Sequence, residues 1–113
     1  MTEFSTHVLD ISAGKPAAGV PVVLEAEVKG GGWKELSRGE TDADGRLRFA
    51  GSPGFVSEGI YRLTFETRTY FQARKIQGLY PQVCVLFQVR NAKERHHIPL
   101  LLSPFGYSTY LGS

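Results

Sequence analysis

The chain has 113 residues, of which 42% are hydrophobic and 21% charged, a balance typical of a globular protein and not of a disordered one. Its formal net charge of +2 is small and its basic residues are scattered, which disfavours a nucleic-acid-binding protein. The single cysteine, Cys84, excludes an internal disulfide, no apolar run approaches the ~20 residues of a membrane helix, and the first residues do not form a signal peptide. We therefore expect one cytoplasmic domain over residues 1–113, of a size that association with other copies would stabilise.

Most of the chain alternates apolar and polar residues with a period of two, which is the pattern of half-buried strands. In residues 20–28, for example, Val22, Leu24 and Ala26 share one face while Glu25 lies on the other. In chain order the pattern predicts strands at 5–11, 20–28, 33–40, 47–50, 59–66 and 82–89, and two more within 96–110 on either side of Ser103 and Pro104.

One short helix is expected at 67–75, with Tyr70 and Phe71 on its apolar side. A helix of this length is not stable alone and must be held by packing. Pro99 would confine its strand to a sheet edge or a bulge. Seven or eight short strands with Gly- and Pro-rich turns between them predict an all-β, antiparallel sandwich.

The candidates for chemistry are His7, His96 and His97, because the sequence contains no phosphate-binding glycine loop, Cys-x-x-Cys, Gly-x-Ser-x-Gly or His-Glu-x-x-His motif. An imidazole with the ordinary pKa of ~6.5 exchanges protons near neutral pH. His96 and His97 should point to opposite faces of a strand, so at most one of them joins a given site. These residues alone leave the function open, because a histidine in a small sandwich is commonly just a solvated or hydrogen-bonded strand residue.

A metal site needs three or four convergent ligands. Only two of the histidines could converge, and the nearby carboxylates of Asp10, Asp42 and Asp44 lie in loops or at strand ends. We therefore expect neither a metal ion nor another cofactor.

Three segments carry a resemblance to a known family. They are STHVLDISAGKPAAGVPV near the start, TDADGR in the middle and HIPLLLSPFGYSTYLGS at the end. Together they resemble, in order and over nearly the whole chain, the signatures of the 5-hydroxyisourate hydrolases, the enzymatic relatives of transthyretin.

The resemblance implies a transthyretin-like sandwich of seven to eight strands, assembled as a homotetramer with active sites in the channel where two dimers meet. It also implies that 5-hydroxyisourate, the unstable product of urate oxidation, is hydrolysed to 2-oxo-4-hydroxy-4-carboxy-5-ureidoimidazoline. By the family pattern, the catalytic residues are His7, Arg46 and His97. Tyr110, Gly112 and Ser113 would close the site and contact the substrate.

Leu111 departs from this pattern, because the family ends in Tyr-Arg-Gly-Ser and this chain has leucine where arginine is expected. If residues 107–111 form a regular strand, Tyr110 and Leu111 face opposite ways. With Tyr110 toward the channel, Leu111 would then serve packing or assembly. If the arginine contacted substrate instead, its loss would weaken the enzyme.

Hydrolysis of this acyl carbon–nitrogen bond without a metal requires a base for water, a cation for the developing oxyanion and an acid for the leaving nitrogen. His7 and His97 can supply the acid and the base, with either histidine in either role. Arg46 remains charged and suits the oxygens of an anionic purine derivative. Ser113 lacks the neighbours of a covalent nucleophile, and its hydroxyl or carboxylate would instead orient water or substrate.

Two other classes of function remain open at this point. One is a catalytically weakened, transthyretin-like protein that binds a small molecule, which the Leu111 departure would fit. The other is a purely structural sandwich module. Fold alone does not separate the three.

Overall fold

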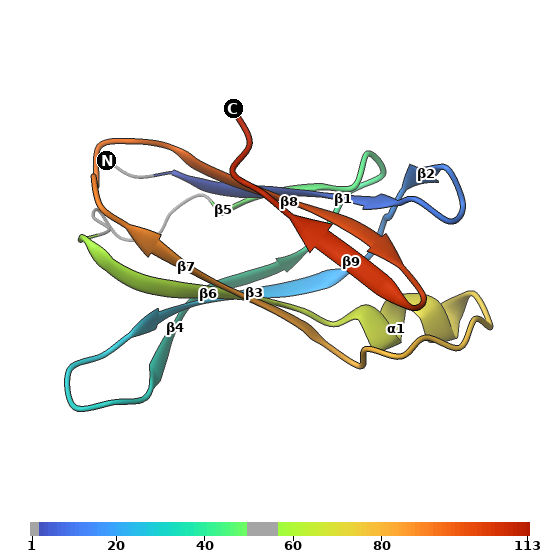
Figure 1. Cartoon of the computed structure of the whole chain (residues 1–113), viewed down its shortest axis with the longest axis horizontal. Coiled ribbons are helices and arrows are strands. Elements are labelled where there is room, and N and C mark those ends of the chain that lie inside the picture. The colour runs from blue at the N-terminus through green and yellow to red at the C-terminus, as the bar shows by residue number, and fades with distance from the viewer. Residues whose placement is uncertain (1–2, 50–56) are drawn as a thin grey trace.

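The computed structural model describes residues 3–49 and 57–113, which form two β-sheets packed face to face with one helix at one end (Figure 1). The strands are β1 (Phe4–Asp10), β2 (Lys15–Pro16), β3 (Pro21–Glu27), β4 (Trp33–Glu40), β5 (Arg46–Phe49), β6 (Gly59–Phe65), β7 (Val83–Val89), β8 (His96–Ser103) and β9 (Gly106–Thr109). The helix, α1 (Thr67–Ala73), joins β6 to β7.

Each sheet is built around a central strand pair. In one sheet the order is β2-β1-β8-β9. Strand β5 pairs with the N-terminal half of β1, and β2 pairs with its C-terminal end along the same edge. The other sheet has the order β4-β3-β6-β7. All pairs are antiparallel except β1 with β8, which run parallel. The first and last thirds of the chain therefore meet in adjacent strands of one sheet.

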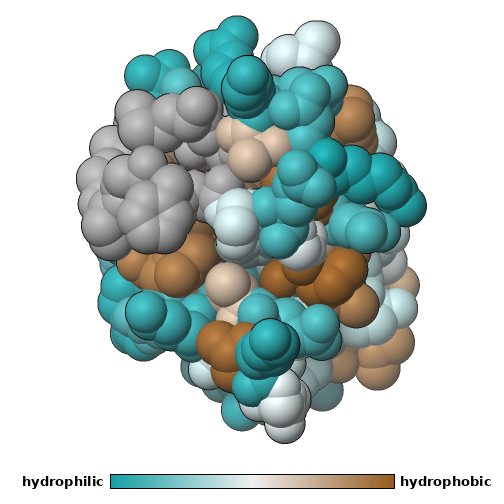
Figure 2. Space-filling model, turned by 90° about the vertical axis from the view of Figure 1, so that its left-hand side faces the viewer, coloured by the Kyte–Doolittle hydropathy of each residue, from teal (hydrophilic) through white to brown (hydrophobic). Residues whose placement is uncertain are grey.

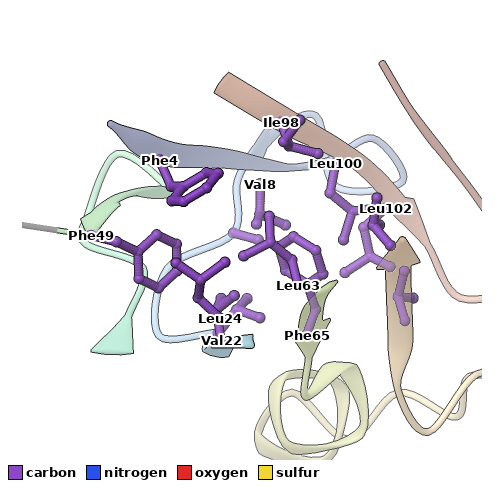
Figure 3. Packing of buried hydrophobic residues seen from close by; sticks show 14 of the residues in the cluster. Phe4, Val8, Val22, Leu24, Phe49, Leu63, Phe65, Ile98, Leu100 and Leu102 are labelled. Atoms are coloured by element: carbon purple, nitrogen blue, oxygen red, sulfur yellow. The ribbon is translucent and has the colours of Figure 1, made fainter. Parts of the chain in front are cut away.

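Alternation along the strands separates a core face from an outer face. In β1, Phe4 and Val8 point inward and are almost fully buried, and Leu100 and Leu102 of β8 continue the same layer. They pack against Leu24, Leu63 and Phe65 of the opposing sheet (Figure 3). Residues of β1 and β8 at the intervening positions, including both members of the Ser5–His97 pair, are consequently directed to the outer face.

The sandwich predicted from the sequence is confirmed. The described residues contain nine strands, one more than the upper expectation, because the two-residue β2 lies in a stretch that reads as a turn. The strand predicted at 47–50 is β5, displaced by one residue toward the N-terminus, and Ala50 lies outside the described residues. The expected inward face of β3, carrying Val22 and Leu24, is buried.

The prediction that Pro99 confines its strand to an edge or a bulge is wrong, because β8 lies between β1 and β9. The structure accommodates the proline through a gap in the pairing. The β8–β9 ladder ends at the Leu100–Thr109 pair, and pairing resumes only at the His97–Gly112 bridge. The Pro99 carbonyl accepts a hydrogen bond from Thr109 Oγ1 at 2.6 Å. Because the nitrogen and the carbonyl of a strand residue point to the same side, the Pro99 nitrogen, which has no hydrogen to donate, also faces the side where the C-terminal segment leaves the ladder.

The end of the molecule at the left of Figure 1 is shown face-on in Figure 2. Hydrophilic residues cover most of its visible surface, and the hydrophobic residues form separate patches rather than one continuous face. Large exposed hydrophobic side chains include Leu86, beside the C-terminal segment, and Phe105, in the β8–β9 turn.

Helix α1 is held by a buried polar contact as well as by its apolar side. Tyr70 and Phe71 are buried, as the sequence predicts, and Tyr70 Oη donates a hydrogen bond to Asp10 Oδ2 at 2.7 Å. Burial by itself would raise the pKa of Asp10, but hydrogen bonds from Ser12, Tyr70 and the Ala13 amide outweigh it and hold that pKa below its ordinary value. Burial, together with the hydrogen bond to Asp10, raises the pKa of Tyr70 to about 12. Asp10 thus ties the end of β1 to the helix in its charged form.

Replacing Tyr70 by Phe should lower the free energy of unfolding by about 1–2 kcal/mol, because it removes a donor from a buried carboxylate. A carboxyl whose pKa is lowered by folding stabilises the native state above its ordinary pKa and loses that contribution as pH falls through the lower native value. The difference between Tyr70→Phe and the natural protein should therefore shrink below pH 3.8. Urea unfolding at several pH values measures it. The matched control is Tyr107→Phe, which alters an exposed tyrosine, and an equal loss in both variants would contradict this account.

Candidate active site

The registers of two strand pairs bring the predicted catalytic residues onto one sheet face. In the parallel β1–β8 ladder, Ser5 lies opposite His97 and His7 opposite Pro99. In the antiparallel β1–β5 ladder, His7 lies opposite Arg46. Residues paired across a ladder point to the same side of the sheet. His7, Arg46 and His97 consequently share the outer face of the five-stranded sheet, although they come from three separate segments of the chain.

A pocket of about 380 Å³ opens on this face. Arg46, His97, Gly112 and Ser113 line it, together with Ser5, which sequence reasoning did not single out. Arg48 and Arg95 also line the pocket, and Arg48 Nε is 3.2 Å from the Glu3 carboxylate. The side chains that line the pocket include three arginines and the two carboxylates of Glu3 and Asp42, and this excess of one positive charge favours an anionic ligand.

The loop at residues 41–46 fixes the position of Arg46. The Asp42 carboxylate accepts hydrogen bonds from the backbone amides of Asp44, at 2.9 Å, and Arg46, at 3.0 Å. Gly45 has a φ of +77°, and a Cβ there would lie 2.4 Å from the Val8 carbonyl oxygen, so only glycine fits this approach to β1. The Asp-Gly pair thereby lets the loop turn tightly enough to start β5 with Arg46 beside β1.

The same loop orients His7. Nε2 of His7 lies 2.9 Å from the Asp44 carbonyl oxygen. A carbonyl oxygen can only accept, so Nε2 carries a proton and donates it to this bond. Nδ1 is the nitrogen of His7 that remains for proton exchange with a ligand.

His97 is half-buried between two fixed groups. Its Nδ1 lies 2.8 Å from Ser5 Oγ, and the backbone amide of Gly112 donates to the His97 carbonyl at 2.8 Å. A Cβ at Gly112 would come within 2.6 Å of His97 Cδ2, so the glycine allows the C-terminal segment to lie directly against the ring. Burial lowers the pKa of His97, and the positive charges of Arg46, His7 and Arg95 lower it further. At neutral pH this imidazole is therefore kept in its neutral form.

His96 points the other way, as expected for adjacent strand residues. It is buried on the core face, with ring centroids 6.0 Å from Phe4 and 6.3 Å from Phe87. Its Nδ1 lies 3.1 Å from the Glu94 carbonyl oxygen. Of the two adjacent histidines, His97 therefore faces the pocket and His96 does not.

The C-terminal segment divides between two pockets. Gly112 and Ser113 lie in the His97 pocket, and in Figure 1 the C-terminus rises from the outer face of the upper sheet. Tyr110 and Leu111 instead line a separate pocket of about 410 Å³ beside β7, with Leu86 among its other residues. Strand β9 ends at Thr109, so the regular alternation that would direct Tyr110 and Leu111 to opposite faces does not extend to them.

Ser5 and Arg95 are pocket residues that the sequence interpretation missed. Ser5 precedes His7 by two positions in the same strand, and this spacing could have indicated a shared face. Arg95 follows no such pattern. Within the ranges that the structure describes, no group of three or more His, Cys, Asp or Glu side chains is placed to hold a metal ion, and no helix is long and apolar enough to cross a membrane.

The fold and the pocket together define a β-sandwich protein that bears imidazole and guanidinium groups on the outer face of one sheet. Residues 4–112 match the model of the HIUase/Transthyretin family. The 5-hydroxyisourate hydrolase of Salmonella typhimurium is 45% identical over 109 residues, which cover 96% of this chain and 79% of that protein. The chain belongs to the HIUase/Transthyretin family.

Solved structures agree with this assignment. The structure of Klebsiella pneumoniae 5-hydroxyisourate hydrolase superimposes with a TM-score of 0.85 at 36% identity, covering 100% of this chain and 94% of that one. Sea bream transthyretin in complex with thyroxine superimposes with a TM-score of 0.83 at 25% identity, covering 97% of this chain and 96% of that one. Both the hydrolase and transthyretin thus share this fold.

The electrostatics of the pocket predict how His97 titrates. Its pKa should lie below 6.5, and Arg95→Gln should move it upward, because the substitution removes one of the positive charges that disfavour the imidazolium. Following the His97 ring signals by NMR as a function of pH measures both values. Arg90→Gln, which removes a charge outside this pocket, is the control and should leave the titration unchanged. A His97 pKa above 6.5, or one indifferent to Arg95, would contradict this account.

Proposed function

We propose that this protein is a 5-hydroxyisourate hydrolase, which opens the six-membered ring of 5-hydroxyisourate by acid–base catalysis without a metal. The observation that carries the proposal is that His7, Arg46 and His97 share one sheet face, on which Arg46 and His97, though not His7, line the arginine-containing pocket. Urate-derived substrates are anionic and rich in carbonyl oxygens, which suits this set of donors. The family relatives named 5-hydroxyisourate hydrolase support the choice of substrate.

The reaction assigns one role to each of the three side chains. His97, held neutral, accepts a proton from water as the water oxygen bonds to the ring acyl carbon. The guanidinium of Arg46 faces the oxyanion that forms on the carbonyl oxygen. As the carbon–nitrogen bond breaks, the leaving nitrogen takes a proton from Nδ1 of a protonated His7, while Nε2 stays bonded to the Asp44 carbonyl. Water is thereby added across the bond, giving a carboxylic acid and a ureido N–H. The acid releases its proton as it becomes a carboxylate, and proton exchange with solvent returns His97 to its neutral form and His7 to its protonated one.

The C-terminal residues divide in the same proposal. Gly112 and Ser113 line the His97 pocket and are proposed to contact the substrate. Tyr110 and Leu111 lie beside β7 and are 54% and 69% exposed, so we assign them to an interface with another copy. A cytoplasmic location completes the proposal, since a chain with the single Cys84 needs no oxidising compartment for an internal disulfide.

The substitutions His97→Asn and His96→Asn form a matched pair. Loss of His97 should reduce kcat by ~10²–10⁴-fold, the usual range for a lost acid or base. His96→Asn changes a residue on the core face and should have a far smaller effect on kcat. The rates are measured spectrophotometrically on 5-hydroxyisourate made freshly with urate oxidase. Equal losses in the two variants would refute the role of His97.

The proposal includes a homotetramer, in which two edges of the sandwich supply the contacts. Strands β7 and β9 end their respective sheets, and the pocket between β7 and the C-terminal segment is lined by exposed Leu86, Tyr110 and Leu111. Unpaired edge strands with apolar side chains are sites of association. Light scattering at micromolar concentration should give the mass of four chains, and a persistent monomer would contradict the proposal.

Leu111→Arg tests whether the departure at this position has weakened the enzyme. Because Leu111 lies outside the His97 pocket, the substitution should leave kcat within a few-fold and change mainly the stability of the assembly, by about 1 kcal/mol. Leu79→Arg adds the same charge at another exposed site and is the control. A gain of tenfold or more in Leu111→Arg alone would mean that the natural chain lacks a substrate contact. That result would favour the alternative of a weakened relative that binds small molecules, as sea bream transthyretin binds thyroxine.

A further inference from the structure

Ser5 contacts the reacting imidazole from a position 92 residues away in the chain. The parallel register places it directly opposite His97, and Ser5 Oγ lies 2.8 Å from His97 Nδ1. Both side chains are half-buried and both line the pocket. The contact is thus a part-buried one between two residues of the pocket lining, and not one made by a fully exposed hydroxyl.

The contact determines which part of the ring faces the pocket. In an imidazole, Nδ1 and Cδ2 flank the atom that joins the ring to the chain. Ser5 lies against Nδ1, and the C-terminal segment lies against Cδ2, where a Cβ on Gly112 would come within 2.6 Å. With both flanks covered, the tip of the ring, formed by Cε1 and Nε2, is the edge left open. Nε2 is therefore the nitrogen of His97 that exchanges a proton with water.

The base role then fixes the direction of the Ser5 hydrogen bond. For Nε2 to hold a lone pair, the proton of the neutral ring must be on Nδ1. The hydroxyl oxygen of Ser5 can accept a hydrogen bond from this Nδ1–H. The same hydrogen bond remains when Nε2 becomes protonated during the reaction, because Nδ1 keeps its proton. One contact thus serves both charge states of His97.

We propose that Ser5 is a positioning residue that holds His97 as its Nδ1–H tautomer, with Nε2 directed into the pocket. This inference rests on the proposed function, because it assigns His97 as the base. Ser5 itself neither touches the reacting atoms nor forms a bond to the substrate.

The test compares Ser5→Ala, Ser5→Thr and the control Ser108→Ala, which removes an exposed hydroxyl from the outer face of β9 in the same sheet. Ser5→Ala should lower kcat about tenfold with KM within threefold, the size expected for one lost orienting hydrogen bond. The acid limb of kcat/KM should move to lower pH, because the imidazolium loses an acceptor. Ser5→Thr keeps the hydroxyl, so it should restore kcat to within a few-fold of the natural value and return the acid limb to the natural pH. Ser108→Ala should match the natural protein in both measurements.

Nitrogen NMR of the His97 ring, recorded without substrate, separates this inference from the proposed function. The natural protein and Ser5→Thr should hold the neutral ring as Nδ1–H, and Ser5→Ala should move it toward Nε2–H, the form that an unconstrained histidine favours. An Nε2–H ring in the natural protein, or the same tautomer in Ser5→Ala, would overturn the role of Ser5 whether or not the protein is a hydrolase. Equal losses of kcat in Ser5→Ala and Ser5→Thr would overturn it as well, since they would indicate packing alone. Failure to hydrolyse 5-hydroxyisourate, with the tautomer as expected, would instead count against the proposed function.

Discussion

The parallel pairing of β1 with β8 is the constraint on which the rest of the site depends. It joins the two ends of the chain and sets Ser5 beside His97 and His7 beside Pro99. A shift of one residue in this register would turn His97 inward and His96 outward, since side chains alternate along a strand. The core opposes such a shift, because Phe4, Val8, Leu100 and Leu102 would leave the interior together. The packing of the sandwich thus holds the register of the candidate site in place.

Charge then determines what the assembled residues can do. Arg46 and Arg95 line the pocket and favour an anionic ligand, and their positive charges add to burial in disfavouring protonation of His97. One pair of guanidinium groups thus serves both features of the proposed site, the attraction of an anion and a neutral His97. The Gly45 and Gly112 positions bring the backbone close enough for this to happen, since a Cβ at either would clash with β1 or with the His97 ring.

Much of this arrangement could be predicted from the sequence because it follows from local patterns. Period-two alternation predicted the strands, and adjacency in one strand separated His96 from His97. The family resemblance brought His7, Arg46 and His97 together, which spacing alone could not do, because register between distant strands is a property of the folded sheet. The same limit explains the error at Pro99: a gap in the ladder opposite that residue depends on where β9 ends. The placement of Tyr110 and Leu111 in one pocket likewise depends on where β9 ends, which the sequence pattern does not show. The role inferred for Ser5 depends on its contact with His97 across the β1–β8 ladder.

Turnover distinguishes a hydrolase from a carrier that has kept the same pocket. The most direct measurement supplies freshly made 5-hydroxyisourate in about a thousandfold excess over protein chains and follows its decay against a blank without protein. Our account predicts that the natural protein consumes the whole excess much faster than the blank, with one oxygen from labelled water in the new carboxylate. Decay of the substrate at the rate of the blank, or loss of no more than one equivalent of substrate per site before the rate falls to that of the blank, would contradict the account.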